Sequence, residues 1–366
     1  MLSKISKIFR LSVVLTTLLL VGLTSLPLTV IAATNDSNSV LVSLVSSTTK
    51  PLLDPTFDSA KVKLGITPTG WSNSDDLTID LNPPIPYQQI LSEIALSGFK
   101  GTQNAPKFPK TLGDLQKELE IRGLTISEPW VGTEFTTGKA KETFEELDKQ
   151  IAFMKAIGGN TIVVAELGGA VHQKEVIDEN GVNIGVDPLK NRPRFSPQQW
   201  CDLLRGLNQM GKKAKENGMQ LMYHPHIGTG VENFEDVDRL MADTNPEYVN
   251  LLLDTGHLYY AGVDPLKVAQ KYANRIKHVH LKNIRQSVLD DSRKTGRSFL
   301  NSIRAGIFTV PGDSSGAIDF QPILQELAKV NYRGWLMVEA EQDPNKAEPL
   351  QYALMARKYL QKLIGF

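Results

Sequence analysis

The histidines and several carboxylates of this chain are gathered where apolar runs end. Five of the six histidines fall between positions 224 and 280. Five runs end in polar residues, in the segments Ala165-Glu166-Leu167, Tyr223-His224-Pro225-His226, Leu253-Asp254-Thr255-Gly256-His257, His278-Val279-His280-Leu281-Lys282 and Val338-Glu339-Ala340-Glu341. A charged group at the end of a buried segment is costly unless it is paired or bound to a metal. Mixed imidazole and carboxylate ligands suit Mn²⁺, Co²⁺, Fe²⁺ or Zn²⁺, so these residues predict a divalent metal centre.

The spacing of these residues leaves some choices open. Three pairs lie two residues apart: His224 and His226, His278 and His280, and Glu339 and Glu341. Along a strand such pairs point to one face and differ only in depth. Parity therefore does not decide which member of a pair binds a metal and which one supports it. Asp254 directly follows an apolar run and is expected at a strand end, with a helix cap as the alternative.

Eight β-rich runs alternate with eight amphipathic stretches from residue 61 onward. The predicted strands are 62–68, 99–103, 124–131, 161–167, 219–226, 249–254, 276–282 and 335–341. The predicted helices are 86–97, 111–122, 139–157, 196–217, 234–242, 265–272, 321–330 and 347–363. This alternation predicts a (β/α)₈ TIM barrel, whose catalytic groups sit at the carboxyl ends of the strands. An open doubly wound sheet is the alternative, and it is disfavoured because no glycine-rich phosphate loop follows an early strand.

Composition limits the partners of the protein. The 366 residues carry 40 basic and 40 acidic side chains, and this balance argues against nucleic-acid binding, which needs a basic surface. The single cysteine, Cys201, excludes an intramolecular disulfide and a cysteine-based zinc or iron–sulfur site. The expected partner is a small molecule, and a homo-oligomer is compatible with the sequence.

The first 33 residues have the pattern of a secretory signal peptide, because three basic residues precede an uncharged apolar stretch that ends in small residues. We therefore expect a signal peptide at 1–33, a flexible linker at 34–60 and a catalytic domain at 61–366. The protein would be exported, to the periplasm or beyond, without stable membrane insertion after cleavage. An uncleaved segment that anchors the protein is the alternative, since the stretch is long enough to span a bilayer.

From about Lys63 onward the sequence resembles the inosose (2-keto-myo-inositol) dehydratases, within the xylose isomerase-like TIM-barrel superfamily of sugar phosphate isomerases and epimerases. The matching segments are Gly65-Ile66-Thr67-Pro68-Thr69-Gly70-Trp71, Tyr223-His224-Pro225-His226-Ile227-Gly228-Thr229-Gly230-Val231, Leu253-Asp254-Thr255-Gly256-His257, His278-Val279-His280-Leu281-Lys282, Phe308-Thr309-Val310-Pro311-Gly312-Asp313 and Val338-Glu339-Ala340-Glu341-Gln342-Asp343-Pro344. Each segment alone is a weak signal, and together they are specific.

The resemblance implies one divalent metal ion held by four groups on the fifth to eighth strands. Carried over by motif, the ligands are His224, Asp254, His280 and Glu339, with His224 where many relatives have Glu. The metal expected first is Mn²⁺ or Co²⁺, with Mg²⁺, Fe²⁺ or Zn²⁺ as alternatives. His257 matches a histidine that contacts substrate or moves protons in sugar epimerases and related dehydratases.

Two features depart from the family. The dehydratases have Glu after Gly-Thr at the end of the second strand, where this chain has Gln103. A neutral amide in place of a pocket carboxylate bears on the substrate or on the rate. The family is also expected to be cytoplasmic, whereas the predicted signal peptide indicates export and a different polyol-derived ketone as substrate.

These residues suit a metal-dependent lyase that removes water from a cyclic polyol ketone such as 2-keto-myo-inositol. The metal would stabilise an enediolate, one group would remove the α-proton and another would protonate the departing hydroxyl. We expect His257 and Glu166 in these roles, in either order; support of a ligand histidine is the alternative for Glu166. The residues expected to bind or enclose the substrate are His226, Lys282, Trp71, Trp130, Glu341 and Gln103. A solvated lysine and core tryptophans are the structural alternatives.

Two other functions remain as alternatives. A metal-dependent sugar isomerase or epimerase, acting on a ketose or keto-sugar, shares the first proton abstraction with the dehydratase. A non-catalytic, secreted sugar-binding protein would need a pocket and no metal ligands. The combination of Asp254, His280 and Glu339 argues against the sugar-binding protein.

Overall fold

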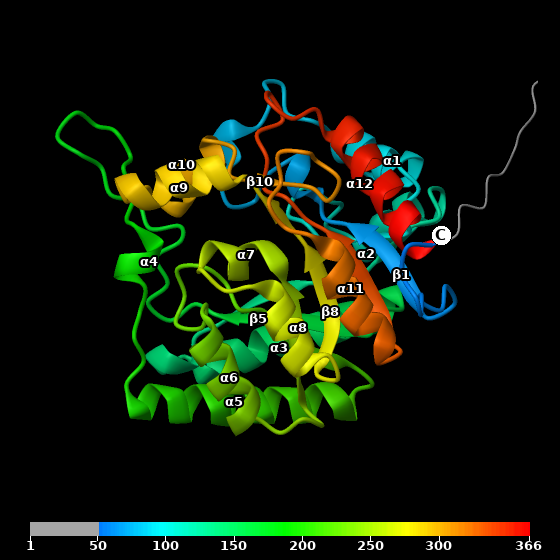
Figure 1. The fold of residues 1–366 in the computed structure, drawn as a ribbon. Helices are drawn as coiled ribbons and strands as arrows, with labels where there is room; N and C mark the ends of the chain where they lie inside the picture. The colour runs from blue at the N-terminus through cyan, green and yellow to red at the C-terminus, as the bar shows by residue number, and fades with distance from the viewer. Residues whose placement is uncertain (1–50) are drawn as a thin grey trace, which may run out of the picture. The chain divides into compact units, whose positions relative to one another are not determined.

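The computed structural model describes residues 51–366 (Figure 1). The predicted signal peptide, 1–33, and residues 34–50 of the predicted linker lie outside the described residues. The rest of that linker, 51–60, contains no helix or strand, yet Leu53 and Phe57 are buried. The Leu53 amide donates to the carbonyl of Leu363 in the last helix at 3.1 Å. This part of the predicted linker therefore packs on the domain.

Nine parallel strands form the central sheet, in the order β3-β2-β1-β11-β8-β7-β6-β5-β4. They are β1 (Val62–Ile66), β2 (Gly101–Thr102), β3 (Thr125–Ile126), β4 (Trp130–Thr133), β5 (Thr161–Glu166), β6 (Gln220–Tyr223), β7 (Val249–Asp254), β8 (Ile276–Leu281) and β11 (Gly334–Val338). The outermost strands, β3 and β4, are consecutive in the chain and only residues 127–129 separate them, so the sheet curves round into a barrel. The predicted (β/α)₈ barrel is confirmed, with β3 and β4 sharing one strand position.

Three of the differences between predicted and observed strands affect where the polar residues lie. The strand predicted at 124–131 is broken into β3 and β4, since Pro129 has no N–H to donate to a ladder. The strand predicted at 219–226 ends at Tyr223, and the one predicted at 335–341 ends at Val338. The histidines after β6 and the glutamates after β11 therefore lie in loops, where strand alternation no longer fixes which way a side chain points.

The eight predicted helices are all present. They are α1 (Tyr87–Leu96), α2 (Leu112–Glu120), α3 (Ala140–Ile157), α5 (Pro197–Glu216), α6 (Phe234–Asp243), α8 (Pro265–Tyr272), α11 (Phe320–Lys329) and α12 (Pro349–Ile364). In α5 the apolar stripe of Leu203, Leu207 and Met210 is buried, as its spacing predicts. Ser196 caps this helix by accepting the Gln199 N–H. Local sequence and burial thus agree on where the helices lie.

Short elements absent from the sequence prediction extend the loops of the barrel. They are η1 (Pro68–Gly70), η2 (Leu77–Ile79), η3 (Phe135–Thr137), α4 (Pro188–Asn191), α7 (Thr255–Tyr260), β9 (Asn283–Ile284), α9 (Gln286–Thr295), α10 (Phe299–Arg304) and β10 (Phe308–Thr309). The excursion from β9 to β10 connects β8 to α11 and carries α9 and α10, drawn in yellow in Figure 1. Arg304 ties it to the loop after β1 by donating to Asp76 Oδ2 at 2.7 Å.

Among residues 51–366, no helix combines the length and the apolar character that crossing a lipid bilayer would require.

Two glycines provide a matched test of this packing. A Cβ at Gly211 in α5 would lie 2.2 Å from the backbone oxygen of Tyr248, whereas a Cβ at Gly113 in α2 would have nothing within 4 Å. Gly211→Ala should lower the free energy of unfolding by about 1–3 kcal/mol through overpacking. Gly113→Ala should raise it by about 0.5–1 kcal/mol, because alanine favours a helix. Urea unfolding measures both, and a Gly211→Ala protein as stable as the wild type would contradict the packing.

Candidate active site

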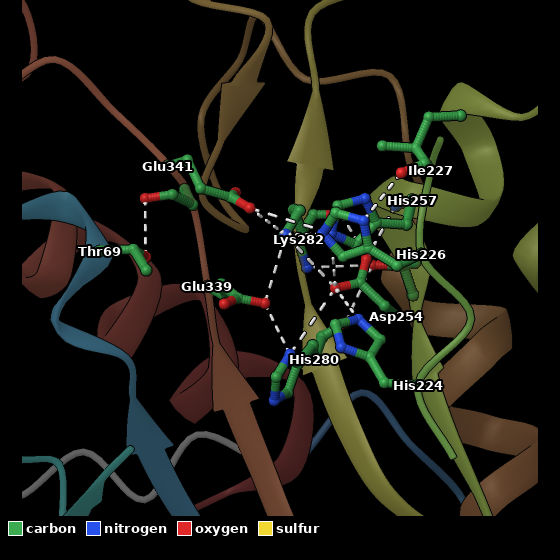
Figure 2. A network of polar contacts seen from close by, with 12 residues as sticks. Thr69, His224, His226, Ile227, Asp254, His257, His280, Lys282, Glu339 and Glu341 are labelled. Atoms are coloured by element: carbon green, nitrogen blue, oxygen red, sulfur yellow. Dashed lines mark hydrogen bonds and ion pairs between the residues drawn. The ribbon is translucent and has the colours of Figure 1, made fainter. Parts of the chain in front are cut away.

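Polar residues from four of the five strand ends meet in one buried cluster at the carboxyl end of the barrel (Figure 2). Asp254 ends β7, His280 lies in β8, and His224 and Glu339 directly follow β6 and β11. Adjacent parallel strands bring their ends to the same rim, which is where barrel enzymes carry their sites. A cavity of about 690 Å³ reaches this cluster and is lined there by His224, His257 and Glu339.

Each predicted metal ligand has at least one buried atom that lacks a hydrogen-bond partner. Those that face the cluster are His224 Nε2, Asp254 Oδ2, His280 Nδ1 and Glu339 Oε2, and His280 Nε2, on the other side of its ring, also lacks one. His280 Nδ1 lies 3.7 Å from Asp254 Oδ2 and 2.6 Å from Glu339 Oε2. The donor atoms of Asp254, His280 and Glu339 all lie within 4.8 Å of one another. Buried polar atoms are nearly always paired, so unpaired atoms that converge fit a divalent cation well.

The ammonium group of Lys282 lies in the middle of this cluster (Figure 2). Its Nζ is 3.4 Å from Asp254 Oδ2 and 3.3 Å from Glu339 Oε2. It donates to Glu341 Oε1 at 2.7 Å and to His257 Nε2 at 2.9 Å. The side chain is fully buried, so the alternative of a solvated lysine is wrong. Burial lowers the pKa of Lys282, but the surrounding carboxylates outweigh it and raise that pKa above its ordinary value.

The surrounding charges give the three carboxyl groups of the cluster different pKa values. Burial raises the pKa of Asp254, but Lys282 and His257 reverse this and hold it well below the ordinary value. For Glu339, His280 and Lys282 likewise outweigh burial and lower the pKa. Burial raises the pKa of Glu341 to about 8 in spite of Lys282. Near neutral pH, Asp254 and Glu339 are therefore carboxylates suited to a cation, and Glu341 can hold a proton.

His226 and His257 form an aromatic wall of the cavity. Their ring centroids are 3.8 Å apart, and Phe299 packs 5.5 Å from His226 and 5.9 Å from His257. Burial lowers the pKa of His257 well below its ordinary value, and the nearby Lys282 adds to this effect. Both histidines are predicted site residues, and the structure places both on the cavity. His257 is therefore a neutral imidazole at neutral pH.

A hydrogen bond connects Trp130 and His224 in the wall of the cavity. The indole Nε1 of Trp130 donates to His224 Nδ1 at 3.3 Å, while His224 Nε2 lies 3.4 Å from Asp254 Oδ2. Trp130 lines the cavity, as predicted, and so does Gln103. Trp71, also predicted to wall the pocket, is instead a core residue that is 1% exposed, with its Nε1 donating to Glu93 Oε2. The prediction for Trp71 is wrong because its ring turns toward α1.

Glu128 is a site residue that sequence reasoning missed. It lies between β3 and β4 and is completely buried. Its two carboxylate oxygens face two imidazoles, with Oε1 3.4 Å from His280 Nε2 and Oε2 3.4 Å from His278 Nε2. Burial raises its pKa, but the two histidines outweigh this and lower it. The available signal was a charged residue inside an apolar strand prediction at 124–131. His278 thus faces Glu128, and His280 faces both Glu128 and the cluster.

Glu166 lies outside this buried cluster. Its oxygens accept three backbone N–H groups, from Phe135, Thr136 and Gly168, at 3.1–3.2 Å. The hydroxyls of Thr133 and Thr136 also donate to it, both at 2.7 Å. The predicted acid–base role does not fit this geometry, because both oxygens are already engaged in holding the η3 turn.

Comparison with known proteins defines the class of this barrel. The family model described as xylose isomerase-like TIM barrel matches residues 91–363. The crystal structure of IolI protein with a zinc atom bound superimposes with a TM-score of 0.57 over 82% of this chain and 98% of that one. At 17% identity this likeness concerns the fold. The class is therefore the xylose isomerase-like TIM barrel.

Closer relatives narrow the class further. An inosose dehydratase of Clostridium tetani is 44% identical over 306 residues, which cover 84% of this chain and 98% of the relative. One of Bacillus cereus is 43% identical over 309 residues, with 84% and 99% covered. The chain belongs to the inosose dehydratase family. The predictions of this family and of a dehydratase, a carbon–oxygen lyase, are confirmed.

The prediction of export, with a membrane anchor as its alternative, is wrong. The inosose dehydratases to which the chain belongs are typically cytoplasmic enzymes. They align with this chain over almost their whole length. A basic start followed by an apolar stretch is a compositional pattern, and this pattern alone does not decide where a protein resides.

The hydrogen bonds of Glu166 predict a structural effect for Glu166→Gln. An amide has one acceptor oxygen for the five donors, so buried N–H and O–H groups lose their partners. We expect the free energy of unfolding to fall by about 1–3 kcal/mol, with the metal content of the folded protein unchanged. Chemical denaturation and metal analysis measure the two. A variant with wild-type stability that has lost turnover would restore the catalytic role.

Proposed function

We propose that this protein dehydrates a cyclic polyol ketone such as 2-keto-myo-inositol, using a divalent cation held by Asp254, His280 and Glu339. The observation that carries the proposal is the convergence of unpaired, buried donor atoms from these three residues at the end of the cavity. Membership of the inosose dehydratase family supports the substrate class, because its named members act on inosose.

The donor set suits Mn²⁺ or Co²⁺ first, since it combines one imidazole with two carboxylates. A cation bound there supplies Lewis-acid stabilisation of the negative charge that develops when a proton is lost beside a carbonyl. Three buried carboxylates, those of Asp254, Glu339 and Glu128, face His280. A divalent cation in place of the His280 Nδ1 proton would add positive charge among them.

We assign the two proton transfers to His257 and Glu341. Both line the cavity, and both contact Lys282 Nζ, at 2.9 and 2.7 Å. Burial lowers the pKa of His257 and raises that of Glu341 to about 8, so at neutral pH the imidazole is neutral and the carboxyl group can carry a proton. His257 Nε2 accepts a hydrogen bond from Lys282, so the imidazole takes up a proton when that bond is broken. Opposite shifts in a neighbouring pair mark the base and the acid. His257 thus removes the α-proton, and Glu341 protonates the departing hydroxyl.

Lys282 returns His257 and Glu341 to their starting protonation states after each turnover. The proton taken from carbon is on His257, and the proton given by Glu341 has left in water. Since the ammonium contacts both residues, it can pass one proton to Glu341 while it takes another from His257 in the same step, so that Lys282 keeps its charge. Phe299 and Phe308, both fully buried, pack against the His257 ring and exclude water from that side of it.

Incubation in deuterated buffer tests the reaction. With 2-keto-myo-inositol we expect loss of water and no deuterium in recovered ketone when abstraction is followed promptly by elimination. An isomerase or epimerase shares the proton abstraction and would instead return labelled, inverted sugar from this ketone or from a common ketose. Labelled, inverted product without loss of water would refute the dehydratase.

Asp254→Asn should abolish tight metal binding, because a neutral amide replaces the carboxylate at the centre of the cluster. We expect less than about a tenth of an equivalent of metal after loading with Mn²⁺ and dialysis, against about one equivalent for the wild type. Elemental analysis of the purified proteins measures this. Full occupancy in the variant would refute the ligand assignment.

The acid role of Glu341 predicts an alkaline limit on activity. The group works only when protonated, so kcat should fall as the pH rises through the pKa of about 8. Glu341→Gln should lose about 10²–10⁴-fold in kcat, as expected when a general acid is removed. The pH profile of kcat measures both effects. An unchanged alkaline limb in an active Glu341→Gln variant would contradict the assignment.

A further inference from the structure

The two histidines beside the proposed cation site have different partners on their outer nitrogens. His224 turns Nδ1 toward Trp130, and His280 turns Nε2 toward Glu128. Each ring directs its other nitrogen, His224 Nε2 or His280 Nδ1, at Asp254 Oδ2, at 3.4 and 3.7 Å. A neutral imidazole carries one proton, so the partner of the outer nitrogen decides what the inner nitrogen presents.

The hydrogen bond from Trp130 fixes the proton of neutral His224 on Nε2, the nitrogen that faces Asp254. An indole nitrogen is a donor only, so His224 Nδ1 must offer its lone pair to accept the Trp130 N–H. The single proton of the neutral ring is then on Nε2. A protonated nitrogen has no lone pair for a metal, and beside the carboxylate oxygen of Asp254 an N–H is the favourable group.

Glu128 has the opposite effect on His280. A lone pair on His280 Nε2 would face a carboxylate oxygen at 3.4 Å and be repelled, so Nε2 carries the proton. His280 Nδ1 faces carboxylate oxygens as well, Glu339 Oε2 at 2.6 Å and Asp254 Oδ2 at 3.7 Å, so without a cation it also carries a proton. A cation bound among these donor atoms would replace the Nδ1 proton, while Glu128 keeps the proton on Nε2. A carboxylate behind a histidine ligand is a common way to orient the ring and fix its tautomer. His278 faces the other oxygen of Glu128 and holds the carboxylate in place.

We propose that Glu128 makes His280 a metal ligand, whereas Trp130 makes His224 a hydrogen-bond donor that does not bind the metal. This inference rests on the proposed function, since it concerns the same cation site. It departs from the four-ligand set expected from the family resemblance. The cation has three protein ligands, which leaves positions open for substrate oxygens. The His224 N–H is a neutral donor at the cavity wall, available to a substrate oxygen that gains negative charge.

Nitrogen NMR of isotope-labelled histidine side chains tests the tautomers. In the metal-free protein we expect His224 to have a proton on Nε2 and a bare Nδ1 whose signal moves in Trp130→Phe. In the Zn²⁺-loaded protein His280 should keep its proton on Nε2. A proton on His224 Nδ1 in the wild type would overturn the inference.

Binding of Co²⁺, followed by titration and by the visible spectrum of the bound ion, tests the ligands. In His224→Gln the amide oxygen can accept the Trp130 N–H and the amide N–H can point inward, so affinity should stay within about threefold and the spectrum should be unchanged. The same variant should lose kcat. His280→Gln should lose at least about 100-fold in affinity. A comparable loss in His224→Gln, with an altered spectrum, would overturn the proposal.

Glu128→Gln tests the positioning role. We expect Co²⁺ affinity to fall about 10–100-fold, as is usual when the partner of a ligand histidine is removed, with a shifted spectrum. Glu232→Gln is the matched control, because Glu232 is also a buried carboxylate and pairs instead with Arg192 at 2.9 Å. It should lower stability without moving the spectrum of the bound ion. Equal effects of the two variants on affinity would refute a specific role for Glu128.

These measurements distinguish a failure of the proposed function from a failure of the inference about His224. A wild-type protein that binds no metal would refute the proposed function, and the tautomer of His224 in the metal-free protein would still decide the role of Trp130. A wild-type protein that binds metal and loses it in His224→Gln would leave the proposed function standing and overturn the inference.

Discussion

The buried ammonium of Lys282 is the interaction on which the rest of the site depends. Three carboxyl groups, those of Asp254, Glu339 and Glu341, meet in the interior within 3.4 Å of its nitrogen. Carboxylates cannot be buried together without a counter-charge, because their desolvation and mutual repulsion exceed any gain from packing. Lys282 satisfies part of this requirement. What remains is a set of unpaired carboxylate oxygens and imidazole nitrogens, and these atoms are the basis on which we propose a cation site.

The barrel strands and two phenylalanines beside His257 give this cluster the surroundings that proton transfer needs. Parallel strands deliver the polar residues to a single rim, while the excursion between β9 and β10 places Phe299 and Phe308 over His257. In the resulting low-dielectric surroundings, small differences in environment separate the pKa values of His257 and Glu341. Histidines that look equivalent are likewise made different by one neighbour each, Trp130 for His224 and Glu128 for His280.

Much of the fold could be predicted from local patterns. Apolar periodicity placed all eight helices and every strand position of the barrel, because amphipathic helices and continuous apolar strands are what such a barrel must bury. The elements that were missed, such as α7, α9 and α10, are short and lie in the loops. Their positions are set by contacts with distant segments, for example Arg304 with Asp76, and no local pattern encodes such contacts. The composition of residues 1–33 predicts export, which membership of the inosose dehydratase family contradicts, because a basic start and an apolar stretch do not by themselves decide where a protein resides.

The sequence by itself determined which residues could do chemistry and on which strand ends they lie, because residue type and hydrophobic period are local properties. Only the tertiary structure decided their roles. In the folded chain, Glu166 and Trp71 point away from the cavity, Lys282 is buried, and Glu128 lies beside His280. The physical reason is that a side chain's protonation and ligation depend on what lies within a few ångströms of it, and in this barrel those neighbours come from strands far apart in the chain.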